Sequence, residues 1–467
     1  MPQNFIECDR EQVFLMPPDV REWLPEGHLA WFVKEAVTEM DLAAFYDAYR
    51  SDGHGRASYE PSMMVAVLLY AYSRGMRSTR AIERALEEDV AYRVLAANAK
   101  PDHATLARFV CRHEQALAGL FGEVLGLCAE AGLLEAGVIS IDGTKIAANA
   151  SRDADRDYEQ IAGEILEQAK AVDRAEDERF GGARGDELPP HLSTHGGRRA
   201  WLRDAKRRHE ERRAQEARPV ARSRAKRLQE AKRRLSENLE VERRSNDAYE
   251  AYRAGGVAKD GRPFGRPPEP YEPPTKPEGK LNLSDPDSRL VKTTHGWIQG
   301  YNAQAAVSED QIVLAAELTN DSGDFGHLEP MVQATEAELE RAGLTEQPQV
   351  VLADAGYWHQ KQMESVITRG TQVLIAPDSK KRKQARAGWE GGYYAFMRRV
   401  LSTEHGGGLY RKRQATVEPV FGNTKFNRGF DRFRRRGRAA ALSEWRLITA
   451  THNLLKLHQH KIAPATG

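Results

Sequence analysis

Cysteine is scarce in this chain, and long apolar runs are missing. Its 467 residues include three cysteines, Cys8, Cys111 and Cys128, with no C-x-x-C pair. This spacing excludes a disulfide framework or a cysteine-built zinc site, and indicates a reducing compartment. The longest apolar run, 63–72, is too short to span a bilayer, and the N-terminus lacks a secretory signal pattern. We therefore expect a cytoplasmic protein with no membrane partner.

Net charge is also nearly absent, at +1, but the charges are unevenly distributed. Residues 198–244 hold 18 Lys/Arg against 8 Asp/Glu, and residues 411–438 hold 10 against 2. Two basic blocks in an otherwise acidic chain predict a polyanionic partner. The length allows two or three domains with a substantial core.

One apolar stretch, VISIDGTKIAA at 138–148, carries a single carboxylate, Asp142, followed by Gly143. Its β-branched residues predict a buried strand, in which Ser140, Asp142 and Thr144 share one face. Burying an acid is costly unless it has a partner, and a metal ion is one such partner. By itself the stretch leaves two interpretations open, a turn-forming aspartate or a metal ligand.

Two further acids occupy comparable positions. Asp354 ends the apolar run VVLAD, and Glu418 lies in TVEPVFG between basic clusters. If the two strands are neighbours, Asp142 and Asp354 meet at their ends. Glu418 would then be the third acid that two hard divalent cations need.

The N-terminal part has the pattern of a helical domain. Pro61 opens a long helix, Ser78 caps a second helix over 79–97, and a third runs from about 102 toward 131. Arg80 and Arg84 lie on the second helix, as in a helix-turn-helix that binds DNA. A plain helical bundle with solvated arginines is the alternative.

Beyond the first strand the pattern changes. Residues 151–280 combine charged helical segments with a Pro-rich stretch at 255–280, which we interpret as an insertion. The following pattern predicts a mixed α/β sheet. We expect strands at 301–308, 312–319, 349–353 and 371–376, and helices at 325–342, 360–369, 416–426 and 442–458.

Several motifs, in this order, resemble those of bacterial insertion-sequence transposases of the DDE class. They are ISIDGTKI, DPDSR at 285–289, GYNAQAAV at 300–307, VLADAGYW at 351–358 and TVEPVFGNTKFNRGFDRFRRRG at 416–437. YEPSMMVAVLLYAYSRGMRSTRAIERAL at 59–86 resembles the N-terminal domain found in one branch of that family. The resemblance covers most of the chain outside the insertion.

The resemblance implies an α/β fold, a ribonuclease-H-like mixed sheet interrupted by a long helical insertion and preceded by an all-α domain. The expected domains are 1–132, a helical DNA-binding domain; 133–150, the first part of the catalytic domain; 151–280, the basic insertion; and 281–467, the remainder with C-terminal helices.

The same resemblance implies a function and a metal site. Asp142, Asp354 and Glu418 would hold two Mg²⁺ ions, with Mn²⁺ as a substitute. The enzyme would bind terminal inverted repeats in double-stranded DNA, cleave the ends by hydrolysis and join the 3′-OH to target DNA, working as a homodimer in the synaptic complex. Two rival functions are a nuclease that does not join and a domesticated DNA-binding relic; the presence of all three acids argues against the relic.

Related transposases also have basic residues around the glutamate. Lys425, seven positions after Glu418, matches that placement. Tyr410 and Arg413 are each one residue out of register with the commonest pattern, which leaves Arg411 or Gln414 as alternatives. The full set of predicted DNA-contacting residues is Lys425, Arg428, Arg413, Tyr410, Arg434, Arg435, Arg436, Arg80 and Arg84. For residues 434–436, a solvated loop is the alternative.

Other residues near the motifs have two interpretations each. Related enzymes use an inserted domain to hold the transposon end, so an aromatic residue could stack on a flipped base or simply pack; the candidates are Trp201 and Trp297. Histidines here are more often structural than metal ligands; they are His295, His327 and His359. For Asp324 and Glu329 we favour helix capping over metal binding. Asn302 and Gln304 would reach the site or DNA, or line a polar sheet face.

Overall fold

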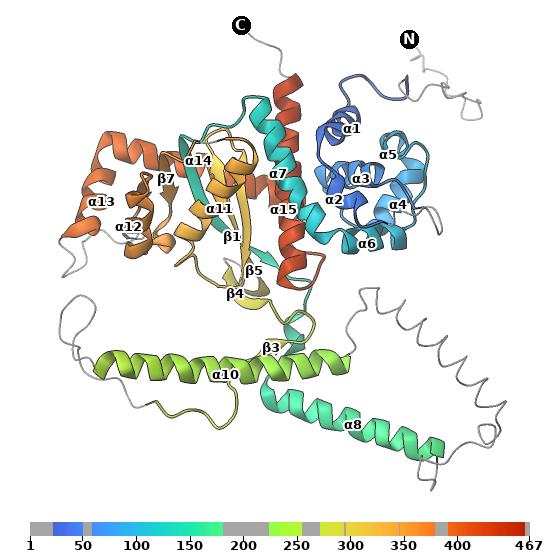
Figure 1. Ribbon diagram of the computed structural model, residues 1–467, viewed down its shortest axis with the longest axis vertical. Helices are drawn as coiled ribbons and strands as arrows, with labels where there is room; N and C mark the ends of the chain where they lie inside the picture. The colour runs from blue at the N-terminus through green and yellow to red at the C-terminus, as the bar shows by residue number, and fades with distance from the viewer. Residues whose placement is uncertain are drawn as a thin grey trace, which may run out of the picture.

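The computed structural model describes residues 22–49, 58–180, 224–254, 271–293, 296–344, 346–378 and 391–462. They form an N-terminal group of helices, a mixed sheet covered by further helices, and two long helices that lie apart from the sheet (Figure 1). No helix in these ranges is long and apolar enough to cross a membrane. Trp201, His295 and the first half of the basic block at 198–244 lie outside the described residues.

The N-terminal part is all-helical, as predicted. Pro61 starts the buried third helix, and Ser78 caps the fourth by accepting a hydrogen bond from Ala81 N. The predicted helix at 79–97 is divided at Asp89, whose carboxylate caps the next helix, and the predicted helix at 102–131 is divided at His113. The helices are α1 (Leu29–Glu39), α2 (Ala43–Tyr46), α3 (Pro61–Ser73), α4 (Thr79–Glu88), α5 (Val90–Leu95), α6 (His103–Arg112) and α7 (Glu114–Glu130).

The predicted first strand, β1 (Val138–Ala147), is central in a six-stranded sheet with the order β4-β5-β1-β7-β8, in which β6 also pairs with β5. β1 is antiparallel to β5 and parallel to β7. The other strands are β4 (Arg289–Thr293), β5 (Gly296–Ser308), β6 (Val313–Thr319), β7 (Val350–Ala353) and β8 (Gln372–Ile375). The mixed α/β expectation is therefore confirmed, and β4 is an additional strand that the pattern did not predict.

The helices that follow the sheet strands complete the core. They are α11 (Leu328–Arg341), α12 (Gln360–Thr368), α13 (Gly392–Ser402), α14 (Glu404–Gly422) and α15 (Arg438–Ile462). A π-helical turn, Asn423–Asn427, follows α14 directly. In Figure 1, α15 runs alongside α7, between the N-terminal helices and the sheet. α13 was not predicted, and α14 begins well before the expected residue 416.

A buried polar junction joins the two parts of the chain. Glu444, in α15, is fully buried and accepts hydrogen bonds from the backbone N–H groups of Arg434 and Arg435, at 2.9 and 3.1 Å. Arg77, just before α4, lies 3.5 Å from the same carboxylate and donates to the Gly429 carbonyl. One acid therefore satisfies groups from the N-terminal and the C-terminal regions.

The insertion has a small core of its own. Its helices are α8 (Tyr158–Phe180) and α10 (Arg224–Ala254), and the short strands β2 (Asp155–Arg156) and β3 (Leu281–Asn282) pair at its base. The buried residues of this core are Ile161, Leu228, Ala231, Leu235, Leu281 and Leu283. Arg234 of α10 is paired with Asp287, whose carboxylate also accepts the N–H of Arg438 at the start of α15. This contact ties the insertion to the main body.

Replacing Glu444 by alanine should destabilise the protein, because it leaves Arg77 buried without its carboxylate and two backbone N–H groups without an acceptor. The expected loss is about 3 kcal/mol in the free energy of unfolding. Urea denaturation followed by circular dichroism measures it. The matched control is Glu340→Ala on exposed α11 surface, which should change stability little; equal effects of the two variants would contradict the junction's role.

Candidate active site

The strands bring two of the three predicted acids together. Ile141 of β1 and Ala353 of β7 are register partners on adjacent strands, which lie about 5 Å apart, so Asp142 and Asp354 come next on the two chains at neighbouring positions. β7 ends there and the chain turns through Ala355–Tyr357, with Gly356 N–H donating to Asp354 at 2.8 Å. Strand pairing therefore produces the predicted carboxylate pair.

The electrostatics of Asp142 are unusual for a carboxyl group. Burial is the largest influence and raises its pKa from 3.8 to about 6, with Asp354 and Asp324 adding to the rise. Arg413 acts in the opposite direction, because its Nη1 donates to Asp142 Oδ2 at 2.7 Å. A buried carboxyl group with a raised pKa, next to a second carboxylate and a single guanidinium, is a setting that an additional cation would relieve.

α14 lies across the face of β1 that carries Asp142. Thr416 donates to Ser140 Oγ at 2.6 Å, and Tyr410 donates to the carbonyl of Ala353, next to Asp354, at 3.2 Å. Tyr410 and Arg413 therefore face the two acid-bearing strands, whereas the alternatives Arg411 and Gln414 are exposed. The predicted face of Ser140 and Asp142 is the one that α14 covers.

Glu418 lies on this helix but points outward. Its side chain is exposed. Along the chain it lies between two residues that contact β1: Thr416 bonds to Ser140, and Lys425 Nζ donates to the Lys145 carbonyl at 2.7 Å. Asp142 lies between those two β1 residues. The helix carrying Glu418 is thus placed along the correct strand, while no contact joins its carboxylate to Asp142 among the described residues.

The helix is irregular next to Glu418. Pro419 has no N–H to donate to the Ala415 carbonyl, and Gln311 Nε2 donates to that carbonyl instead, at 3.1 Å. The π turn Asn423–Asn427 follows within one helical turn. π turns inside helices frequently mark functional sites.

The chemistry of this pair suits a hard divalent cation, because carboxylate oxygens are the ligands that Mg²⁺ prefers. Asp142 and Asp354 therefore fit as two of the predicted ligands. In the part of the chain that the structure describes, no three Asp, Glu, His or Cys side chains are grouped closely enough to hold a metal. The third predicted ligand, Glu418, is not brought to the pair.

Asp324 has contacts that differ from the helix-capping role favoured in the sequence analysis. Capping of α11 was the role favoured for Asp324. The N-cap residue of α11 is His327, however, and no side chain makes a capping hydrogen bond there. The Asp324 carboxylate instead accepts hydrogen bonds from Asn302 and Gln304 of β5, and its charge acts on Asp142. The only available clue was the polar pair Asn302 and Gln304 in an otherwise apolar strand.

The predicted DNA-contacting arginines fall into two groups. Arg428 is buried, its pKa is lowered to about 9 by burial, and it donates to the carbonyls of Tyr72 and Ile448. Arg435 is paired with Glu114 of α7. These internal contacts occupy both side chains, so the structure gives no support to phosphate contacts there. The exposed members are Arg80, Arg84, Arg434 and Arg436.

Lys425 is half-buried beside β1, and its pKa is lowered by burial and by nearby Lys145. Among the other candidates, His359 caps α12 by accepting from Gln362 N, and His327 contacts Asp321 at 3.1 Å. Glu329 accepts from Ser365 at 2.6 Å and does not face the acid pair. His359 is therefore a helix-capping residue, whereas Glu329 is not.

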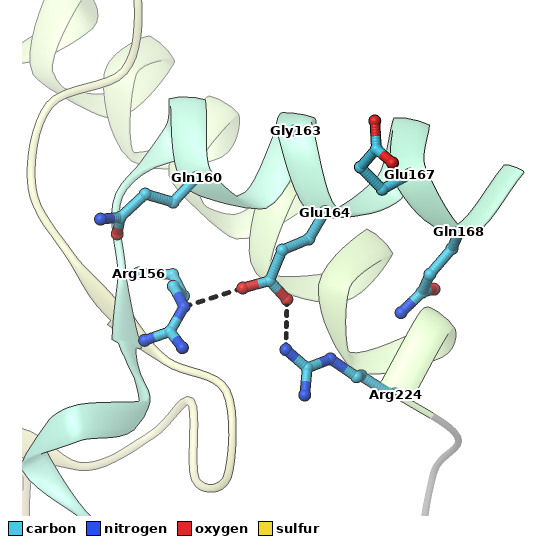
Figure 2. Close-up of a pocket in the computed structure, with 7 residues that line it drawn as sticks. All are labelled: Arg156, Gln160, Gly163, Glu164, Glu167, Gln168 and Arg224. Atoms are coloured by element: carbon cyan, nitrogen blue, oxygen red, sulfur yellow. Dashed lines mark hydrogen bonds and ion pairs between the residues drawn. The ribbon is translucent and has the colours of Figure 1, made fainter. Parts of the chain in front are cut away.

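A cation-lined hollow of about 930 Å³ lies near the end of β1. Trp297 is 52% exposed there. The cationic side chains that line it are Arg152, Lys280, Arg432 and Arg436, with Asp153 and Asp155 as the acidic ones. A different hollow lies on the insertion, where Glu164 accepts from Arg156 and Arg224 (Figure 2); its paired charges leave no evident chemistry.

Comparison with protein families agrees with this geometry. Residues 18–112 match a transposase domain of the DUF772 family, and residues 260–454 match a transposase DDE domain. No curated protein and no solved structure matches the chain. The two domains together are those of a transposase. Taken together, the two matches support an insertion-sequence DDE transposase. β1, with Asp142, precedes the second match and joins it through the sheet.

Gly143→Ala should destabilise the site. A Cβ at this position would lie 2.5 Å from Asp324 Oδ1 and 2.6 Å from Asn302 Oδ1. We expect a loss of about 2 kcal/mol on urea denaturation, because well-packed neighbours must shift. Gly126→Ala in α7, where a Cβ meets no heavy atom within 4 Å, is the control and should not destabilise. An equally stable Gly143→Ala variant would contradict the close packing.

Proposed function

We propose that this transposase cleaves the ends of its own DNA element and joins the 3′-OH to target DNA, with Asp142, Asp354 and Glu418 as metal ligands. The observation that carries the proposal is the neighbouring placement of Asp142 and Asp354 under α14. Glu418 completes the set if its helix adjusts next to Pro419 and the π turn. The mixed sheet around β1 supports a ribonuclease-H-like catalytic fold.

Two Mg²⁺ ions held by these acids would polarise the phosphodiester and supply hydroxide near neutral pH. The protein's own residues prepare that site. Arg413 holds Asp142 in place and offsets its charge, and Tyr410 fixes α14 against the end of β7. Lys425, whose Nζ donates to the Lys145 carbonyl of β1, would exchange that bond for a DNA phosphate near the acids.

DNA binding is proposed for two surfaces. Arg80 and Arg84 are exposed on α4, opposite its buried Ile82 and Leu86, and would contact terminal inverted repeats. The hollow beside Trp297 supplies an exposed indole and several cations, which suits a DNA strand with one base stacked. Synapsis of two ends would make a homodimer the working unit.

Asp142→Asn should lower the rates of two steps, cleavage of an end duplex and joining of a pre-cleaved end, by about a hundredfold or more. The reason is that a charged metal ligand is lost. Gel assays with the duplex flanking the gene measure both steps and DNA binding, which should be retained. Asp310→Asn, exposed in the β5–β6 turn, is the control and should behave as the parent.

The same assays separate the rival functions. Cleavage without joined product would support a nuclease, and binding without either product would support a DNA-binding relic. Glu418→Gln tests the third ligand by itself: activity equal to the parent would remove Glu418 from the site while leaving Asp142 and Asp354 in place.

Metal binding should depend on pH through Asp142. Its raised pKa means that the folded protein holds this proton more tightly than the unfolded chain, so the group's contribution to folding is fully present below its ordinary pKa of 3.8 and is lost as the pH rises from there through about 6. A divalent cation must displace the same proton. We expect Mg²⁺ to raise the melting temperature at pH 7.5, with apparent affinity falling about tenfold per pH unit below 6.

Differential scanning fluorimetry of the full-length protein, with and without Mg²⁺, measures this effect across pH 5 to 8. Asp142→Asn should show no metal-dependent rise at any pH. A rise of the same size at pH 5 and pH 7.5 in the parent would contradict the assigned role of Asp142.

A further inference from the structure

Asp324 lies in the turn between β6 and α11, and its carboxylate packs against the centre of the sheet. Its Oδ1 accepts hydrogen bonds from Asn302 Nδ2 at 2.7 Å and Gln304 Nε2 at 2.8 Å. Lys145 Nζ lies 3.5 Å from the same oxygen. Register places Lys145 beside Asn302 and Gly143 beside Gln304. By strand alternation, this is the face of β1 opposite Asp142.

Two glycines, Gly143 and Gly356, leave space for the Asp324 carboxylate because they have no side chain. A Cβ on Gly143 would lie 2.5 Å from Asp324 Oδ1, and a Cβ on Gly356 would lie 3.4 Å from Asp324 Oδ2. Gly143 follows Asp142 directly and donates its N–H to that carboxylate, at 2.8 Å. Gly356 donates in the same way to Asp354. Asp324 therefore lies against the backbone that holds each acid of the pair.

A second observation concerns the buried polar atoms next to Asp324. Asn302 is fully buried, and its Oδ1 has no hydrogen-bond partner among the described residues. This oxygen lies 2.6 Å from the same Gly143 Cβ position, so it faces the space that Asp324 Oδ1 enters. Lys145 is the cation closest to both, and its buried Nζ makes no hydrogen bond within the described chain. Beside Asp324, one buried acceptor and one buried ammonium group are therefore both left without a hydrogen bond among the described residues.

We propose that Asp324 is a positioning residue for the metal-binding carboxylates. It fixes the Gly143 and Gly356 backbone, and so the placement of Asp142 and Asp354, and its negative charge favours a divalent cation near them. The inference rests on the proposed metal site. Residues that contact the metal ligands, and not the metal itself, commonly contribute ten- to a hundredfold to metal affinity.

Manganese binding to the full-length protein, measured by the electron paramagnetic resonance signal of free Mn²⁺, tests the proposal without relying on activity. Asp324→Asn keeps the size of the side chain and one acceptor oxygen but removes the charge. We expect its Mn²⁺ affinity to fall about tenfold or more, while its affinity for duplex DNA stays at the parent value. Parent-like Mn²⁺ affinity in this variant would overturn the proposal.

Asp321→Asn is the matched control. Asp321 lies in the same turn, its side chain is 68% exposed, and it pairs with His327 instead of the sheet amides. The proposal expects parent-like Mn²⁺ affinity for this variant. If both variants lose affinity equally, the effect belongs to the turn as a whole and the specific role of Asp324 is overturned.

Lys145→Met keeps the test decisive if Asp324→Asn does not fold. It removes the cation paired with Asp324 and keeps an apolar stem of similar length, so Mn²⁺ should bind severalfold more tightly. Affinity that is unchanged or weaker would overturn the proposal. The measurement distinguishes failure of the metal site from failure of the role of Asp324. If the parent protein binds no Mn²⁺, the proposed metal site is contradicted. If the parent and Asp324→Asn bind Mn²⁺ with equal affinity, only the role of Asp324 is contradicted.

Discussion

A carboxylate in the middle of an apolar strand is the constraint around which this fold is arranged. Asp142 lies in β1, with paired strands on both sides, and burial makes its ionised form costly. The cost is offset by Arg413, which is itself buried and is delivered by α14. This ion pair is one of the contacts that hold α14 over β1, together with the hydrogen bonds of Thr416 to Ser140 and of Tyr410 to Ala353.

Arginine has a second task in this protein, away from the acids. Arg428 satisfies carbonyls from α3 and α15, and Arg77 shares Glu444 with the chain that leads into α15. Basic residues that resemble a DNA-binding run in the sequence are therefore divided between the solvent-exposed surface and the junction of the two parts. Because guanidinium groups offer five donors in a fixed geometry, they suit the carbonyl-rich ends of helices as well as phosphates.

Much of the fold could be predicted from the sequence because β-branched alternation and capping residues act locally. β1, β6, β7, the cap at Ser78 and the proline at the start of α3 are examples. The breaks at Asp89 and His113 could not be predicted, since helix propensity continues through both. For the site, the neighbouring placement of Asp142 and Asp354 could be predicted because each acid follows a short apolar run, although β1 continues past Asp142 to Ala147. The role of Asp324 depended on amides of β5 that only the folded sheet brings to it.

The order of segments along the chain has a consequence for synthesis on the ribosome. β1 is made early, but its partners β5 and β7 and the covering helix α14 all follow the insertion. The N-terminal helices can pack while β1 still has both edges open, and the insertion's own small core shortens the free loop that β1 and β5 must close. The carboxylate pair therefore assembles only late in translation, and a product truncated before β7 carries Asp142 without Asp354 or Arg413.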